Sequence, residues 1–219
     1  MIERGMIFNG EMVRAILDGR KTQTRRPVKF PFKDRNLGCE LSGNELAGEL
    51  SSGNYLNSPF GKPGDRIWVR ETFQGPLFDF DQMDAYCKDS APFEKAQFCV
   101  YKADGKPAPE FFDADDNLHC CWRPSIHMPR WASRILLEIT DVRVERLNAI
   151  SQADAIAEGA PASHPSIDCV SQEYRFPDFS RSWFGQTWQY IYGEENWQAN
   201  PWVWVIEFKC IEGGDHATD

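Results

Sequence analysis

Two long stretches of alternating hydrophobic residues in the C-terminal half of the chain constrain the fold most. In ASRILLEITDVRVERL, residues 132–147, apolar side chains recur at every second position and change phase near Thr140. In NPWVWVIEFKCI, residues 200–211, one face carries Trp, Ile and Phe, and the other carries two valines and Glu207. A period of two is typical of β-strands, and a phase change indicates a bulge or bend. The pattern predicts two long strands.

A third strand is predicted after a Pro-Gly turn, in GKPGDRIWVRETF, residues 61–73. Its two faces would carry Ile67, Val69 and Glu71 on one side and Trp68, Arg70 and Thr72 on the other.

Three short helices are predicted from their caps and spacing, at 9–20, 151–159 and 182–193. Asn9 and Ser151 are suitable N-caps, and Gly19 and Gly159 are suitable stops. Several strands of uneven length with a few short helices indicate an α+β chain. We expect a small mixed β-barrel with helices at its ends rather than alternating βαβ units.

We expect a single domain over residues 1–219. Residues 31–62 are rich in Gly, Ser, Asn and Pro, and we predict an irregular segment there. Residues 75–122 are rich in Asp and Glu and read as an acidic insertion with one strand within AQFCVYKA. Residues 160–181 are predicted to be a loop, and the tail from 212 onward to be frayed.

Composition narrows the class of protein. The chain has 219 residues and a net charge of −9, which argues against coating duplex DNA or RNA without specificity. It lacks an apolar run of roughly 20 residues, and charges interrupt its N-terminus where a signal peptide needs an apolar stretch. We therefore expect a soluble, cytoplasmic protein without a membrane partner. Seven cysteines without a regular spacing favour reduced thiols over a disulfide framework.

A basic, hydroxyl-rich stretch, GRKTQTRRP at residues 19–27, stands out in this acidic chain. It could be a solvated surface, or it could bind an anion through Arg and Thr side chains. A third reading is that Lys21 activates Thr24 as a nucleophile for acyl transfer. The residues alone leave these three readings open.

The order of several motifs resembles the ASCH family, whose fold is PUA-like. The stretches are GRKTQTRR, PGDRIWVRETF, ITDVRVERLNAIS and WVWVIEFK, which together cover under half of the chain. The family pattern Gly-x-Lys-x-x-Thr-x-Arg and its Gly-Asp turn are matched here by Gly19, Lys21, Thr24, Arg26, Gly64 and Asp65. The chain also resembles larger ASCH proteins of phage and prophage genomes and, in its motifs, a small bacterial N(4)-acetylcytidine amidohydrolase, which lacks segments 31–62 and 75–122.

This resemblance implies a catalytic Lys21, Thr24 and Glu158 and a small acylated nucleoside as substrate. Thr24 would attack the acyl carbonyl, Lys21 would take its proton, and Glu158 would serve the leaving nitrogen and the water. No metal and no cofactor are implied. To act as a base, Lys21 needs its pKa lowered from about 10.4 to near 7. The alternatives are a non-catalytic module that binds RNA or a modified base and, third, a ribonuclease.

Four further residues are candidates for substrate binding. Arg26 belongs to the family pattern, whereas Arg25 reads as a solvated neighbour. Glu71 could line the pocket or simply pair with Arg66 or Arg70. Trp68 could stack on a base or belong to the core.

Other polar groups carry weaker signals. HCCW at 119–122 lacks the paired spacing of a zinc site, so we assign no metal. His127 and His164 receive no role. HMPRWASR at 127–134 could form a second basic, aromatic edge suited to an RNA strand, although a tryptophan that covers the end of the barrel is the simpler reading.

Overall fold

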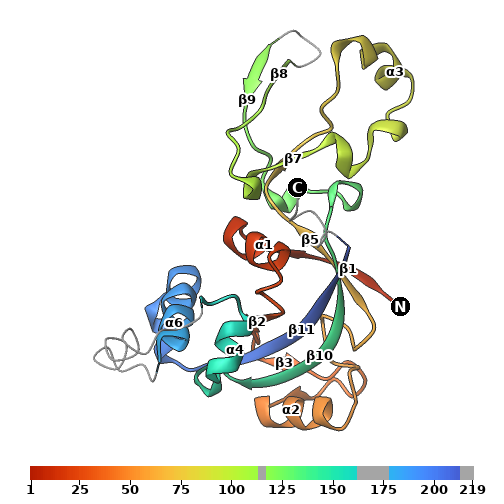
Figure 1. Ribbon diagram of the computed structural model, residues 1–219. Helices are drawn as coiled ribbons and strands as arrows, with labels where there is room; N and C mark the ends of the chain where they lie inside the picture. Colours follow the sequence, from red (N-terminus) through yellow and green to blue (C-terminus); the bar gives the residue numbers. More distant parts are fainter. Residues whose placement is uncertain (113–116, 162–177, 213–219) are drawn as a thin grey trace. The chain divides into compact units, whose positions relative to one another are not determined.

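A computed structural model describes residues 1–112, 117–161 and 178–212 (Figure 1). The chain divides into two compact units, which we describe separately. The first contains residues 1–2, 18–65 and 138–209, and the second contains residues 3–17, 66–137 and 210–219. The predicted loop at 160–181 and the predicted frayed tail lie largely outside the described residues, as does His164.

The described strands form an open sheet of five strands in the order β1-β5-β10-β11-β2, with three further two-stranded sheets. The free edge of β2 (Gln23–Pro27) is met by the end of helix α4 (Gln152–Ala157), where Thr22 N donates to Ala157 O at 2.8 Å. In the described residues the end of α4 therefore covers part of this edge. The mixed α and β character that we predicted is confirmed, but the described strands do not form a closed barrel.

The described part of the first unit is built on five strands and four helices. Its strands are β2, the hairpin β3 (Phe32–Lys33) and β4 (Glu40–Leu41), most of β10 (Leu136–Arg146) and most of β11 (Trp202–Glu212). Its helices are α2 (Gly43–Ser51), α4, α6 (Phe179–Tyr192) and α7 (Glu194–Gln198), with a 3₁₀ turn at Leu147–Ala149.

Residues 31–62 are more regular than we predicted. They contain the β3–β4 hairpin and helix α2, whose N-cap Ser42 and third residue Glu45 form a reciprocal capping box. The helix buries Leu46 and Leu50. We did not predict this helix because its two glycines and its asparagine interrupt the apolar periodicity.

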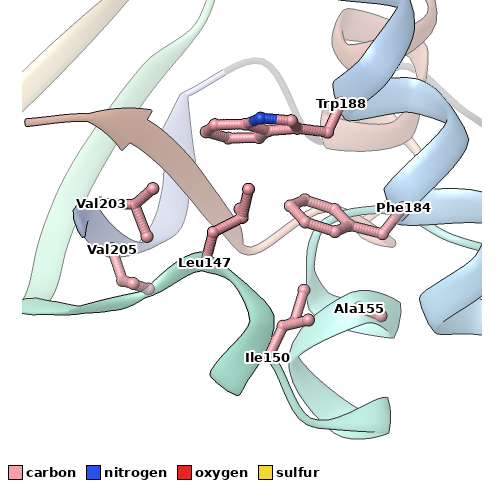
Figure 2. Close-up of a cluster of buried hydrophobic side chains, with 7 residues drawn as sticks. All are labelled: Leu147, Ile150, Ala155, Phe184, Trp188, Val203 and Val205. Atoms are coloured by element: carbon pink, nitrogen blue, oxygen red, sulfur yellow. The ribbon is translucent and has the colours of Figure 1, made fainter. Parts of the chain in front are cut away.

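Both faces of β11 are covered in the first unit. Val203 and Val205 pack with Leu147, Phe184 and Trp188 in a buried cluster (Figure 2). On the alternate face, Trp204 contacts the rings of Phe32 and Phe60, each with a centroid separation of 5.9 Å. The apolar content of this strand therefore reflects burial on both sides.

The predicted phase change in β10 is confirmed. Burial alternates through Leu137 and Ile139, then skips Thr140 and Asp141, and resumes at Val142 and Val144. The strand nevertheless runs without interruption over Leu136–Arg146.

The second unit contains the parallel pair β1 (Glu3–Ile7) and β5 (Arg66–Arg70) and helix α1 (Gly10–Leu17). Asn9 caps α1 as predicted, because its Oδ1 accepts from Met12 N at 2.8 Å. The remaining strands are β6 (Phe73–Gln74), β7 (Val100–Tyr101), β8 (Glu110–Phe112) and β9 (Leu118–Cys120). The remaining helical elements are α3 (Met83–Lys88) and 3₁₀ turns at 80–82, 91–93, 96–98, 102–104, 125–127 and 130–132.

The acidic segment has a small aromatic core of its own. Phe78, Tyr86, Phe93 and Phe98 make ring contacts with centroids 4.7–5.6 Å apart. The single strand predicted in AQFCVYKA is shorter than expected, since only Val100–Tyr101 is extended and pairs with β6. Among the described residues, every helix is too short or too polar to span a lipid bilayer.

Candidate functional site

Helix α4 places Glu158 at a defined point of the first unit. Ser151 caps the helix, as the sequence predicted. The backbone N–H of Asp154 donates to the Ser151 hydroxyl, and the backbone N–H of Ser151 donates to the Asp154 carboxylate. Glu158 is the C-cap residue, and Gly159 follows with φ of 101°. Because such a positive φ favours glycine, the chain turns directly after Glu158.

Lys21 and Glu158 form a buried pair. They make an isolated antiparallel β-bridge, and their side chains are 1% and 5% exposed. Lys21 Nζ donates to Glu158 Oε2 at 2.7 Å and to Glu158 O at 2.9 Å. Two of the three protons of the ammonium group are thus directed at one residue. The structure brings together two of the three residues predicted to be catalytic.

Arg25 is a third member of this cluster, because it also bonds Glu158. The prediction that Arg25 is a solvated neighbour was wrong. Its side chain is fully buried, and its guanidinium lies 5.6 Å from the centroid of the Phe184 ring. One terminal nitrogen donates to Glu158 Oε1 at 3.2 Å, and the other donates to Glu145 Oε1 at 2.6 Å. The two oxygens of Glu158 are therefore held by two different cations.

An outer ring of charges surrounds Arg25. Asp154 lies 3.6 Å from Arg25, and Arg143 contacts both Asp154 at 2.9 Å and Glu145 at 3.3 Å. Arg143 also bonds Glu207 and Gln23. Our sequence reasoning missed Glu145, Asp154 and Arg143 as parts of this site. The available signal was the alternation in VRVER, which puts Arg143 and Glu145 on the same face of β10.

Burial dominates the electrostatics of Lys21. Desolvation lowers the pKa of its ammonium group, and the nearby Arg26 and Arg25 charges act in the same direction. The charge and hydrogen bond of Glu158 oppose this effect but do not cancel it. From the sequence we stated only that a base role requires a lowered pKa for Lys21, and burial is the main cause of the lowering in the structure.

Strand alternation places Thr24 and Arg26 on the face of β2 opposite to that of Gln23 and Arg25. In the antiparallel register with β11, Thr24 lies opposite Ile206 and Arg26 lies opposite Trp204. Successive side chains of a strand point to opposite faces. Thr24 is 1% exposed, and its place beside Lys21 stays a prediction from the resemblance.

Glu71 and Trp68 lie in the second unit and have their own neighbours there. Glu71 does not pair with Arg66 or Arg70, because its carboxylate receives two bonds from Arg134 at 3.0 and 3.2 Å. Burial raises the pKa of Glu71, although Arg134 opposes that shift. The assignment of Glu71 and Trp68 to substrate binding stays a prediction.

Arg134 also reaches Asp104 at 2.6 Å and lies 3.9 Å from the centroid of the Tyr101 ring. Arg134 is thus engaged within the second unit, and the favoured reading of HMPRWASR, a tryptophan that covers the end of the barrel, stays a prediction. Within the described residues, no group of three His, Cys, Asp or Glu side chains is arranged to hold a metal ion.

The fold and the site define a mixed α and β protein with a buried Lys–Glu–Arg cluster at the edge of its sheet. No family model matches the chain, and no curated protein matches it. A crystal structure of a protein from Enterococcus faecalis V583, described as DUF984, is similar over 100% of this chain and 86% of that chain, with 9% identity and a TM-score of 0.39. This likeness is too weak to carry an argument.

Proposed function

We propose that this protein is an amidohydrolase that acts on an acylated nucleoside of the N(4)-acetylcytidine type. The observation that carries the proposal is the buried hydrogen bond of 2.7 Å between Lys21 Nζ and Glu158 Oε2. A carboxylate and an amine at this distance can exchange a proton directly. The resemblance to the ASCH family supports the same pair of residues and a PUA-like fold.

The reaction assigns one role to each member of the pair. The nucleophile's oxygen bonds to the acyl carbon while its proton passes to the neutral amine of Lys21. The C–N bond then breaks, and the nitrogen leaves with a proton supplied through Glu158. In the acyl-enzyme form of the reaction, water activated by Glu158 releases the carboxylic acid and restores the hydroxyl. Lys21 can accept a proton more readily because its pKa is lowered.

Thr24 is the nucleophile that the resemblance implies, although strand alternation assigns it to the face of β2 opposite Arg25, so this role rests on the resemblance alone. A water molecule activated by the Lys21–Glu158 pair would give the same products in one step. Replacing the hydroxyl separates the two routes, since only the acyl-enzyme route needs it. The two routes therefore share the acid–base pair and differ at one side chain.

The cations of this cluster are already paired with carboxylates, which disfavours anion binding and ribonuclease action there. The Lys21 ammonium already bonds Glu158, and the Arg25 guanidinium contacts Glu158, Glu145 and Asp154. A phosphate would have to displace carboxylates from a buried position and would meet their charge. The cluster favours proton transfer to and from a neutral amide.

The test is to incubate the purified protein with N(4)-acetylcytidine and to measure cytidine and acetate by chromatography. We expect Lys21→Met and Glu158→Gln to reduce the rate at least about a hundredfold, because each removes a proton-transfer group. Thr24→Val should do the same on the acyl-enzyme route, and Thr24→Ser should retain activity.

Lys209→Met is the matched control, because this lysine also pairs with a glutamate, at 2.8 Å, but is 59% exposed. It should leave the rate unchanged. Absence of cytidine from a folded protein that still binds the nucleoside would favour the binding module instead. Equal rates in wild type and Glu158→Gln would overturn the assignment of the pair.

A further inference from the structure

Strand β5 of the second unit presents a row of cationic and aromatic side chains. Arg66, Trp68 and Arg70 occupy alternate positions and are partly exposed, whereas Ile67 and Val69 on the other face are each 1% exposed. The tryptophan thus belongs to the half-exposed face and not to the core, which was the simpler of our two sequence readings.

The neighbouring strand β1 is shaped to receive this tryptophan. Gly5 lies opposite Trp68 in the parallel register of the two strands. A Cβ atom at Gly5 would lie 2.6 Å from Trp68 Cζ2, which is closer than real Cβ contacts allow. The indole therefore lies directly against the backbone of β1. Arg70 lies over the same ring, with its guanidinium carbon 5.4 Å from the ring centroid.

Positive charge is in excess around this tryptophan. Arg66 and Arg130 share a single carboxylate, Glu3, at 3.7 and 3.1 Å. Arg70 donates to the backbone oxygen of Ile126, which is uncharged. Three positive charges thus face one negative charge, in a chain whose net charge is −9.

The hydrogen-bonding capacity of these arginines is also not used up. In the described part of the chain, the buried Nε atoms of Arg66 and Arg70 have no hydrogen-bond partner. An incoming anion would reach the terminal nitrogens of these partly exposed side chains rather than the buried Nε atoms.

We propose that this face of β1 and β5, defined by Arg66, Trp68, Arg70 and Arg130, binds single-stranded nucleic acid. Unpaired bases stack on aromatic rings and on guanidinium planes, and both groups are present here, in Trp68 and Arg70. The arginines would hold the backbone phosphates on either side of the stacked base. An acidic peptide would use the charges but not the indole, and duplex DNA would keep its bases paired. This inference is independent of the proposed hydrolase, since it uses other residues.

The test is fluorescence anisotropy of labelled 12-nucleotide single strands, one of RNA and one of DNA, at 50 and 200 mM salt with the full chain. We expect Trp68→Leu to weaken binding about tenfold at both salt concentrations, because stacking depends little on salt. Arg66→Gln should weaken binding and flatten its salt dependence by about one phosphate contact. A preference for one strand type would identify the natural ligand as RNA or DNA.

Arg146→Gln is the matched control, because Arg146 also lies over a tryptophan, Trp202, at 4.5 Å, but belongs to the first unit. It should bind as wild type does. The proposal is overturned if neither strand binds, if Arg146→Gln weakens binding as much as Arg66→Gln does, or if a glutamate polymer competes as well as the oligonucleotide. Arg66→Gln, at a side chain 31% exposed, keeps the test valid should Trp68→Leu fail to fold. Hydrolysis of N(4)-acetylcytidine should be unchanged in Arg66→Gln and Arg146→Gln, so failure of one proposal leaves the other standing.

Discussion

Lys21 makes two hydrogen bonds to one residue, Glu158, through both its carboxylate and its backbone carbonyl. Because both side chains are buried, loss of one partner leaves an uncompensated charge. We predict that Glu158→Gln lowers the free energy of unfolding by about 3 kcal/mol. The double variant Lys21→Met/Glu158→Leu should recover much of this loss, since it buries no ion at either position. Urea unfolding measures both. The control is the more exposed ion pair between Lys209 and Glu138. Glu138→Gln should lower the free energy of unfolding by less than about 1 kcal/mol.

The lowered pKa of Lys21 predicts the direction of the pH dependence of hydrolysis. Only the neutral amine accepts a proton, and its population rises with pH through the pKa of the folded protein. The rate should therefore rise with pH and level off below 10.5, the ordinary value for lysine. Removing the Glu158 charge should move this rise to lower pH while reducing the maximum rate. A rate that falls across the same range would contradict the role of Lys21 as a base.

Asp34 predicts a loss of stability in acid. Hydrogen bonds from the backbone of Leu37 and from the side chain of Asn57 lower the pKa of its carboxylate below 3.8. The folded state therefore holds this proton less tightly than the unfolded chain does. The stabilisation is present above pH 4 and is lost as the pH falls through the folded-state value. Asp34→Asn should destabilise the protein at pH 6, and the difference from wild type should shrink at pH 3.

Two glycines of helix α2 should respond to alanine with opposite signs. A Cβ at Gly43 would lie 2.2 Å from the Trp202 ring, whereas a Cβ at Gly48 meets nothing within 4 Å. Gly43→Ala should cost about 1–3 kcal/mol through overpacking. Gly48→Ala should gain about 0.5–1 kcal/mol, because alanine loses less backbone freedom in a helix. Thermal unfolding of the two variants checks this, and the same sign for both would contradict the packing described.

Arg134 stabilises the second unit by neutralising Glu71 and Asp104. Arg134→Met should cost about 3 kcal/mol at pH 7, because Glu71 is left buried and charged. Burial already raises the pKa of Glu71, and loss of Arg134 raises it further. A raised value means that protonation favours the folded state, so the cost should be smaller at pH 5. Arg130→Met, which breaks a more exposed pair, should cost less than about 1 kcal/mol at either pH.

Local signals in the sequence were sufficient for α1, α4 and the phase change of β10, because caps and alternation are properties of neighbouring residues. Glu158, one residue beyond the capped helix α4, came instead from the resemblance to the ASCH family. Local signals failed for Arg25, because its partners Glu145 and Glu158 lie 120 and 133 positions further along the chain. Nothing in TRRP indicates which of the two arginines these carboxylates contact. Local signals failed for Glu71 for the same reason, because Arg134 is 63 positions away.

The bridge between Lys21 and Glu158 has a consequence for solubility as well as for chemistry. Strand β2 is the last strand of the sheet, and the end of α4 occupies part of its outer side. An uncovered strand of this kind offers its backbone to another chain. The bridge between Lys21 and Glu158 therefore covers part of this edge, and we predict that variants that loosen the bridge self-associate before they unfold.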